Sequence, residues 1–531
     1  MNYLENTISQ IIEEQNIPFE WNSLVDQELE NIKLKENLNR KDLTNEPFVT
    51  IDGEDAKDFD DAVFCHLNKS LYTLKVAIAD VASVVSYNSE LDKEAFKRGT
   101  SIYFPNTVIP MLPEMISNNI CSLVPNKKRN VLVCEMIFNL GAKIQSYKFY
   151  EAEISSFKRF TYHEIQDYKI DNSEICQSIE SLKELTNKLL ENKLKRNALE
   201  IESTEPVISI DKDGGILDIS STTRLFAHQM IEESMIAANI CAAKFIKKHY
   251  GYGIYRVHEE PESVKVEGLK KFFSLKGHSA KKNSTTLDLI NSLINHANKN
   301  ENNKLFNIMI LQSLKRAQYS TKEIGHFGLQ LEKYTHFTSP IRRYPDLIVH
   351  RMIKNILNNT GSTFVQEDLD NELGELSSLE KRAEISARQV NQHLICHHLK
   401  KFIGDEFNTF VVGIAEFGLF CEIDKYFISG LVHVSDLKRD RYIFDNQANI
   451  LKGRKTGKTY RIGGHASIMD SVTAGNGSFL YAHNGSQQFT LARTRNDGTD
   501  SADYSGHGIN ILFTATATTL VFELELNTGG S

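Results

Sequence analysis

The 531-residue sequence lacks the cysteine pairs of a zinc ribbon or of a disulfide framework. Its seven cysteines are an odd number, lie far apart and form no CxxC pair. A reducing compartment, the cytoplasm, is therefore the expected location. The N-terminus (MNYLENTISQ) also lacks the basic and then apolar pattern of a signal peptide.

Positive charge is not in excess, and no apolar run predicts a membrane span. Lys and Arg number 61 against 69 Asp and Glu, and the net charge of −8 disfavours a protein that coats duplex nucleic acid non-specifically. Residues 504–522 carry no charge but are rich in Thr, Gly, Ser and Asn, which favours a β-strand with polar flanks. No membrane partner is expected. A local basic track for nucleic acid stays open.

What the sequence does contain begins with a polar lead-in, residues 1–47. A short amphipathic helix around residues 7–15 is too small to bury a core alone, so we expect it to pack on a later part of the chain. From residue 48 to about 153 the pattern is mostly strand-like, for example over residues 71–79 (LYTLKVAIA) and 131–138. A helix near residues 89–98 interrupts these strands, with Ser89 as its N-cap.

Helices dominate the next part of the chain. Apolar residues recur at helical spacing over four segments, residues 222–249, 287–297, 305–314 and 371–401. Strands followed by helices predict an α+β domain, which we place at residues 48–403.

Residues 404–463 return to a period of two. The stretch 408–435 alternates apolar and polar residues with glycines at its turns, which predicts a small β-barrel of the OB-fold class. From residue 464 the composition changes abruptly. The last 68 residues hold no Lys and eight charged side chains, and they form a Gly/Ser/Thr-rich, β-like tail of unknown kinship.

A basic segment lies within the predicted barrel. Eight cations stand there against two acids, and they are Lys438, Arg439, Arg441, Lys452, Arg454, Lys455, Lys458 and Arg461. A solvated loop is the simplest explanation of such a run. An excess of six positive charges beside an aromatic-bearing barrel favours a track for a nucleic-acid backbone instead.

The strongest chemical signal is an acidic loop in the segment FVTIDGEDAKDFDDAVF. An apolar strand runs into six acids within ten residues, namely Asp52, Glu54, Asp55, Asp58, Asp60 and Asp61. Like charges this dense repel one another unless a cation lies among them, and oxygen ligands alone select Mg²⁺ or Mn²⁺. A solvated turn is the competing interpretation, while an EF-hand loop fails on its glycine and glutamate spacing. The sequence therefore predicts a metal site.

A second cluster is YTHFTSPIRRYPDLIVHR, where a helix is expected to start near Pro345. Arg342, Arg343 and Arg351 gather there beside two histidines, and an arginine fork suits phosphate and the charge that develops during phosphoryl transfer. A salt-bridge network with Asp346 is the structural alternative, and it is as well supported for Arg343 and Arg351. Carboxylates for metals together with an arginine suit metal-assisted phosphodiester hydrolysis.

The two segments IDGEDAKDFDD and HFTSPIRRYPDLIVHR resemble the signatures of the ribonuclease II/R (RNB) family of 3′→5′ exoribonucleases. GTSIYFPNTVIPMLPE, HQMIEESMIAAN and GHFGLQL resemble further segments of that family and occur in the same order. The resemblance covers about residues 10–463 and is closer to the bacterial ribonuclease R branch than to ribonuclease II.

The resemblance implies a hydrolase that degrades single-stranded RNA processively from a free 3′ end and releases nucleoside 5′-monophosphates with Mg²⁺. The family's four catalytic aspartates fall on Asp52, Asp58, Asp60 and Asp61, and its catalytic arginine falls on Arg342. Asp52 and Asp61 would hold one metal ion, while Asp58 and Asp60 would complete the site and help to place a second. The tyrosine that stacks on the 3′-terminal nucleotide falls on Tyr103, which by pattern alone would be a core aromatic.

Further substrate contacts are expected from Arg343 and from the basic barrel residues Lys452, Arg454, Lys455 and Lys458. A monomer is expected. Two cold-shock OB domains usually precede the family's catalytic domain, and we expect neither of them within the lead-in of residues 1–47. The 464–531 tail begins where another strand pair should close the barrel. Two alternatives stay open, a catalytically impaired RNA-binding protein on the same scaffold and a DNA exonuclease.

Overall fold

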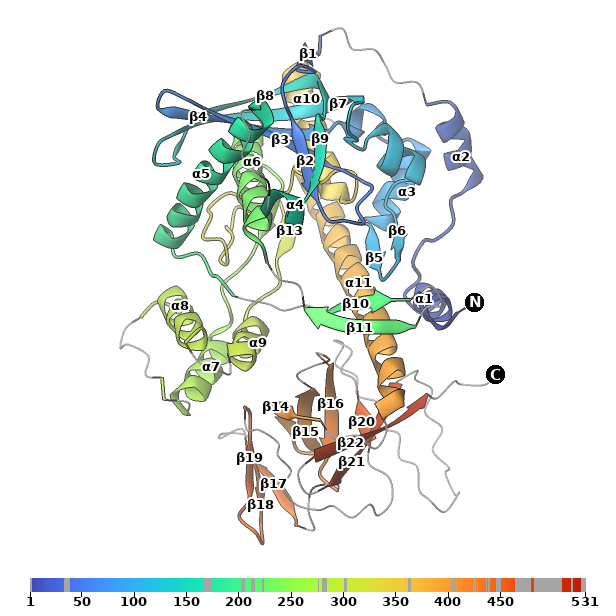
Figure 1. Ribbon diagram of the computed structural model, residues 1–531, viewed down its shortest axis with the longest axis vertical. Coiled ribbons are helices and arrows are strands. Elements are labelled where there is room, and N and C mark those ends of the chain that lie inside the picture. The colour runs from blue at the N-terminus through green and yellow to red at the C-terminus, as the bar shows by residue number, and fades with distance from the viewer. Residues whose placement is uncertain are drawn as a thin grey trace.

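The computed structural model describes most of residues 2–463 and three strands beyond them (Figure 1). The described residues are 2–32, 39–166, 168, 173–201, 206–211, 215–221, 224–275, 277–278, 284–299, 303–361, 364–402, 407–423, 426, 428–435, 437, 440–445, 450–463, 479–481, 509–516 and 519–526.

A seven-stranded sheet lies in the upper body of Figure 1, in the order β1-β8-β7-β4-β3-β2-β9. Its strands are β1 (Lys41–Asp42), β2 (Val49–Asp52), β3 (Asp61–Asn68), β4 (Leu71–Ala79), β7 (Lys128–Asn139), β8 (Ile144–Ser155) and β9 (Lys158–Thr161). The predicted strand 71–79 is β4, and the last six residues of β4 are all buried. The sheet is antiparallel from β2 to β8, and β9 adds to β2 in parallel.

Helices pack around this sheet, and those that the sequence predicts begin within about five residues of their expected starts. The predicted helix 89–98 is α3 (Glu90–Arg98), and the Ser89 hydroxyl accepts a hydrogen bond from the Asp92 amide, which confirms the N-cap. The others are α2 (Ser23–Glu30), α4 (Tyr162–Gln166), α5 (Glu174–Lys195), α6 (Phe226–Tyr250), α10 (Tyr344–Asn358) and α11 (Gln366–Leu399). Three further helices, α7 (Ser263–Leu275), α8 (Thr286–Ala297) and α9 (Asn303–Ser313), form a separate apolar core with one another. The sequence did not predict α2, α4, α5 or α7. The α+β class is thereby confirmed.

The 34-residue helix α11 joins the sheet body to the lower body (Figure 1). Leu369, Leu373 and Leu376 in its first half are buried in the same apolar core as the sheet. Leu394 and Leu399 in its second half are buried in a second core, together with strands from the C-terminal part of the chain. One rigid element therefore contributes to both cores.

The N-terminal helix α1 (Tyr3–Glu14) packs against the second half of α11. Ile11 is fully buried there, and the Tyr3 ring stacks on the His397 ring with centroids 3.7 Å apart. The expectation that this helix packs on a later part of the chain is confirmed, although its partner lies almost 400 residues downstream.

The predicted barrel consists of two three-stranded antiparallel sheets. The first contains β14 (Thr409–Ala415), β15 (Gly418–Ile423) and β16 (Ile428–His433), and the second contains β17 (Tyr442–Asp445), β18 (Ile450–Gly453) and β19 (Thr459–Arg461). Gly418 is required at the β15–β16 contact, because a Cβ there would lie 2.3 Å from the Val432 carbonyl oxygen.

The tail contributes β20 (Phe479–Tyr481), β21 (Ile509–Thr516) and β22 (Thr519–Leu526), which pair with one another. The expectation of a single strand over residues 504–522 is wrong. The chain reverses after Thr516, since Thr516 pairs with Thr519, and the segment contributes to two antiparallel strands. Across the described residues, no helix is both long and apolar enough to cross a membrane.

A buried charge cluster ties the end of β4 to α10. The Asp80 side chain has no exposed surface and contacts the Arg40 guanidinium at 2.5 Å and the Lys354 ammonium at 2.6 Å. Burial by itself would raise the pKa of Asp80, but Lys354 and Arg40 outweigh it and hold the pKa below its usual value.

Asp80→Asn should lower the free energy of unfolding at pH 7 by about 3 kcal/mol, because two poorly exposed cations lose their nearest carboxylate and keep only Glu151, which lies 3.4 Å from Arg40 and 3.5 Å from Lys354. The pKa of Asp80 is lower in the folded protein than in the unfolded chain. Its contribution to the free energy of unfolding is therefore fully present above the pKa of the unfolded chain, and it is lost as the pH falls through the pKa of the folded protein. Urea unfolding measures the free energy of unfolding of wild type and variant. The difference between the two should become smaller as the pH drops from about 5 toward about 3. The exposed pair Lys93–Glu90 supplies the control, since Glu90→Gln should cost under about 0.5 kcal/mol. An equal difference at every pH would contradict this role.

Candidate active site

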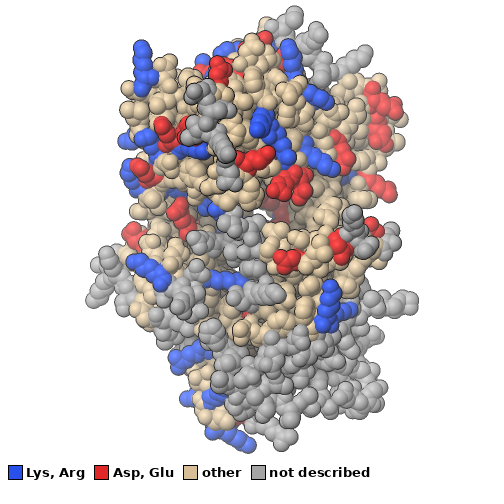
Figure 2. Space-filling view, in the orientation of Figure 1, with Lys and Arg blue, Asp and Glu red and all other residues tan. Residues whose placement is uncertain are grey.

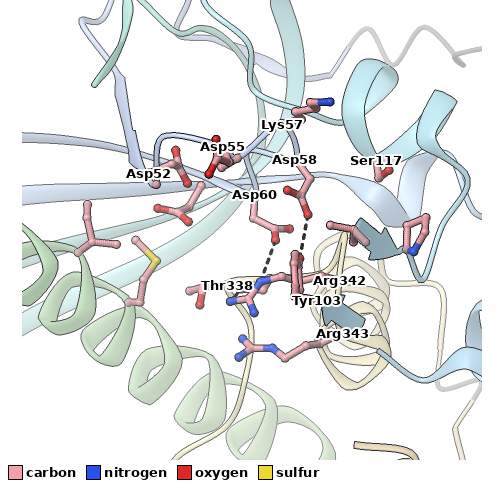
Figure 3. A pocket seen from close by; sticks show the side chains of 18 of the residues that line it. Asp52, Asp55, Lys57, Asp58, Asp60, Tyr103, Ser117, Thr338, Arg342 and Arg343 are labelled. Carbon is pink, nitrogen blue, oxygen red and sulfur yellow. Dashed lines mark hydrogen bonds and ion pairs between the residues drawn. The ribbon is translucent and has the colours of Figure 1, made fainter. Parts of the chain in front are cut away.

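The acidic loop joins two neighbouring strands of the sheet. β2 ends at Asp52 and β3 begins at Asp61. Residues 53–60 are the loop that connects the end of β2 to the start of β3. The loop forms one wall of a cavity of about 1440 Å³, which all four predicted aspartates line together with Tyr103, Arg342 and Arg343. Figure 2 shows acidic side chains beside a hollow near the middle of this face. Segments nearly 300 residues apart thus meet at one site, as the motifs predicted (Figure 3).

Asp60 is the most tightly held of the four aspartates. It is 4% exposed, and one of its carboxylate oxygens accepts a hydrogen bond from the Ile341 amide at 2.9 Å. The other oxygen lies 3.6 Å from Nε of Arg342 (Figure 3). Burial raises the pKa of Asp60 well above its usual value, and the Arg342 charge opposes that shift.

Arg342 combines a fixed backbone with a partly exposed side chain. Its carbonyl accepts hydrogen bonds from the Ser101 amide at 3.0 Å and from the Thr100 hydroxyl at 2.9 Å. Its guanidinium donates to the Ser339 hydroxyl at 3.1 Å and is 43% exposed. The fork therefore has donors free to meet a ligand in the cavity.

Tyr103 contacts the acidic loop at Asp58, two residues before Asp60. It lies on β5 (Ile102–Phe104), which forms a hairpin with β6 (Thr107–Ile109). Its hydroxyl donates to Asp58 at 3.0 Å (Figure 3), and its side chain is 45% exposed. The structure thus places Tyr103 on the cavity wall and not in a core, which is where an aromatic ring can stack on a base.

Asp52 and Asp61 are both half-buried, and their charges act on each other. Burial and the neighbouring Asp61 charge raise the pKa of Asp52, while burial raises the pKa of Asp61 against the charges of Arg342 and Arg343. One carboxylate oxygen of Asp52 is buried without a hydrogen-bond partner. Such an oxygen is costly unless a cation or a proton satisfies it.

The donor set fits a hard divalent cation by its chemistry, because it consists of carboxylates with no Cys or His ligand. Among the described residues, however, no three His, Cys, Asp or Glu side chains are gathered closely enough to hold an ion. The metal site is therefore supported by the residue types and by the orphaned Asp52 oxygen, and it stays a prediction.

The other two acids of the loop are exposed. Glu54 and Asp55 line the cavity and are exposed, and neither is among the four aspartates that the family resemblance singles out. Arg159 on β9 holds this end of the loop, since its guanidinium donates to the carbonyls of Gly53 and Glu54. The sequence pattern did not single out Arg159.

The remaining arginines of the second cluster are engaged by protein carboxylates. Arg343 donates two hydrogen bonds to Asp346, at 2.8 and 2.9 Å, although it also lines the cavity. Arg351 is buried and bonds to Asp92 and to the Val85 carbonyl. Arg351 therefore has the structural role that the sequence left open, and substrate binding by Arg343 stays a prediction.

Sequence reasoning missed Tyr162 as a cavity residue. It lies at the start of α4, and its ring stacks on His228 of α6 with centroids 3.9 Å apart. Burial raises its pKa, and so do the charges of Asp61 and Asp52. Its one sequence signal is its position directly after β9, which is not enough to separate it from a core aromatic.

The basic barrel residues lie apart from the aspartates. Lys452, Arg454, Lys455 and Lys458 belong to β18 and the turn that leads to β19, and none of them lines the cavity. Asp440 fixes this turn by accepting hydrogen bonds from the amides of Lys455 and Thr456. Figure 2 shows Lys and Arg side chains at this lower end of the molecule. Lys438 and Arg439 lie outside the described residues.

Fold and site together define an α+β domain with a carboxylate and arginine centre, followed by an OB-type barrel. The RNB domain family matches residues 40–359, and the S1 RNA binding domain family matches residues 400–465. The chain therefore belongs to the RNB family, in its ribonuclease R branch, and the predicted OB fold of the barrel is confirmed as an S1 domain.

Similar proteins agree with this assignment. Ribonuclease R of Vibrio parahaemolyticus is 37% identical over 481 residues, which are 85% of this chain and 57% of that protein. Ribonuclease R of Escherichia coli is 37% identical over 480 residues, which are 85% of this chain and 58% of that protein. A structure of Mycoplasma genitalium RNase R in complex with ribose methylated single-stranded RNA matches with a TM-score of 0.82 and 32% identity, over 87% of this chain and 74% of that one. The chain spans less than two thirds of the two curated relatives.

Proposed function

We propose that this protein is a 3′→5′ exoribonuclease that hydrolyses single-stranded RNA processively and releases nucleoside 5′-monophosphates. The observation that carries the proposal is the gathering of Asp52, Asp58, Asp60, Asp61 and Arg342 in one cavity. A protein that binds RNA without cutting it would gain nothing from four acids that repel both one another and the RNA phosphates.

Asp52, Asp58, Asp60 and Asp61 would hold Mg²⁺, or Mn²⁺, in this proposal. When bound, the ions would polarise the scissile phosphate as Lewis acids and would help to activate the attacking water. The orphaned, buried oxygen of Asp52 is the observation on this chain that favours a cation there. Support from the family is general, since divalent metal dependence accompanies RNB ribonucleases.

Arg342 stabilises the negative charge that develops on the phosphate during hydrolysis. Its guanidinium projects from a backbone fixed by Thr100 and Ser101, so little reorganisation is needed when that charge appears. Asp60 holds the guanidinium from one side, at 3.6 Å, which leaves the exposed side of the fork for the substrate.

Single-stranded RNA with a free 3′ end is the proposed partner, and it would reach the cavity with its last base against the Tyr103 ring. Arg343 and the S1-domain residues Lys452, Arg454, Lys455 and Lys458 would contact the backbone further along the strand. The structure of the Mycoplasma genitalium relative is a complex with ribose methylated single-stranded RNA, which supports this class of ligand.

The proposed boundaries are residues 1–47 for the lead-in, 48–403 for the catalytic domain, 404–463 for the RNA-binding domain and 464–531 for the tail. All seven cysteines are free and buried, which suits a reducing cytoplasm. A monomer is proposed. The competing function, an impaired RNA-binding protein, is disfavoured by the complete set of acids and Arg342.

The test compares a single-stranded RNA with a DNA of the same sequence, each incubated with the purified protein and Mg²⁺. Chromatography of the products should show nucleoside 5′-monophosphates from the RNA and little release from the DNA. Greater release from the DNA would support the DNA exonuclease alternative, and equal release would contradict the preference for RNA. Nucleoside 3′-monophosphates would show that the P–O5′ bond is cleaved in place of the P–O3′ bond, which would contradict the proposal.

A pair of variants tests the stacking role of Tyr103. Tyr103→Phe keeps the ring and loses the hydrogen bond to Asp58, so KM should change less than about threefold, whereas Tyr103→Ala should raise KM about tenfold or more, as expected for one stacked base. Steady-state kinetics on a short RNA measures both. Equal KM values for the two variants would contradict stacking.

A further inference from the structure

The acidic loop is held in shape by neighbours rather than by its own backbone. Within residues 53–60, which the structure describes in full, a backbone hydrogen bond joins the Ala56 amide to the Gly53 carbonyl at 3.3 Å. The Leu123 and Ala79 amides donate from outside to the carbonyls of Phe59 and Asp60, at 3.0 and 2.9 Å. The loop that carries the aspartates therefore depends on residues from β4 and from the segment before β7.

Ser122 is the side chain that grips the loop at its centre. Its hydroxyl donates to the Lys57 carbonyl at 2.7 Å and accepts from the Phe59 amide at 3.0 Å. These two groups flank Asp58 on either side. Ser122 is fully buried, and its own carbonyl accepts a hydrogen bond from Nε of Arg129 at 2.9 Å. The backbone of Ser122 is therefore also held in place.

We propose that Ser122 is a positioning residue for catalysis, whose hydroxyl fixes the backbone on both sides of Asp58 and thereby sets where that carboxylate and the Tyr103 hydroxyl meet. This inference rests on the proposed function, because Asp58 is one of the proposed metal-holding acids. It assigns a role to a residue outside both signature motifs and outside the cavity lining.

The physical reason is the short reach of an aspartate. One methylene group separates the carboxylate of an aspartate from the backbone, so a shift of the backbone moves the carboxylate by a similar distance. A displacement of about 1 Å at a reacting group can lower the rate about a hundredfold. No other side chain is bonded to the loop backbone on both sides of one aspartate among the described residues. Loss of the hydroxyl also leaves the buried Phe59 amide without its acceptor.

Ser178 offers a matched control. It is also a buried serine, 4% exposed, and its hydroxyl accepts a hydrogen bond from the Cys65 amide at 3.0 Å on the β3 side of α5. Ser122→Ala and Ser178→Ala therefore each remove one buried acceptor from a backbone amide. They differ in two respects: the amide that loses its acceptor belongs to the acidic loop only for Ser122, and Ser122→Ala also removes the hydroxyl that donates to the Lys57 carbonyl.

The experiment measures kcat, KM and RNA affinity in EDTA for wild type and both variants, together with amide hydrogen exchange of the peptide covering residues 53–61. Ser122→Ala should lower kcat at least tenfold, leave KM and RNA affinity within about twofold, and speed exchange in that peptide. Ser178→Ala should leave kcat within about twofold and exchange in that peptide unchanged. Ser122→Cys keeps the packing with a weaker hydrogen-bonding group and should fall between wild type and Ser122→Ala if the alanine variant folds poorly.

Equal kcat losses for the two alanine variants, or a kcat for Ser122→Ala within twofold of wild type, would overturn the inference. An inactive wild-type protein would instead overturn the proposed function. In that case hydrogen exchange alone still decides whether Ser122 holds the loop, since unchanged exchange in Ser122→Ala would overturn that role as well.

Discussion

Asp60→Asn should lower kcat about a thousandfold or more while RNA affinity stays the same or becomes tighter. Asn keeps the oxygen that accepts the Ile341 amide, so the fold around the site is preserved. It removes a buried negative charge that lies next to Arg342 and beside the position proposed for the scissile phosphate. The charge is needed for metal-assisted hydrolysis, and its absence reduces repulsion of the RNA backbone.

The control for this variant is Asp55→Asn in the same loop. Asp55 is exposed, so its loss should change kcat less than about threefold. Single-turnover kinetics gives the rate of cleavage, and fluorescence anisotropy in EDTA gives the affinity for RNA. Loss of binding together with activity in Asp60→Asn would show that the acid cluster is structural and would contradict its catalytic role.

Arg342→Lys should lower kcat about a hundredfold with KM nearly unchanged. Lysine keeps the positive charge but loses the planar fork that can meet two phosphate oxygens while also contacting Asp60 and Ser339. The loss falls on kcat because the charge that Arg342 meets develops in the transition state.

Arg382→Lys is the matched control for this substitution. Arg382 lies on α11 outside the cavity, where its guanidinium donates to the Asn16 carbonyl at 3.3 Å. Its kcat should stay within about twofold of wild type. A rise in KM with unchanged kcat in Arg342→Lys would assign that arginine to ground-state binding and contradict transition-state stabilisation.

The regular elements that could be predicted from the sequence are those whose periodicity is strong and whose ends carry local signals. β4 coincides with the predicted strand, and Ser89 caps α3 as expected. The hairpin of the tail could not be predicted as two strands, since Thr and Ala around Thr516 carry no turn signal that separates β21 from β22.

The site could be predicted as far as its motifs reach and no further. The acids and Arg342 are dense local patterns, and they do line one cavity. The contacts that hold them are made across the chain, such as Ile341 to Asp60 over 281 residues and Ser122 to Phe59 over 63. Nothing in the local sequence around Ser122 or Arg159 indicates a partner that distant in the chain. The pairing of Arg343 with Asp346, by contrast, could be predicted. The two residues are three positions apart at the start of a helix, and this spacing brings their side chains together.

The measurement that tests the central claim most directly uses a 5′-labelled single-stranded RNA with the purified protein and Mg²⁺, and a parallel sample with EDTA. The account predicts a ladder of labelled fragments that shortens from the 3′ end to a short stub, and no cleavage in EDTA. Intact RNA that is shifted on a native gel would contradict it and support RNA binding without catalysis. Immediate release of a labelled mononucleotide would contradict the 3′→5′ direction.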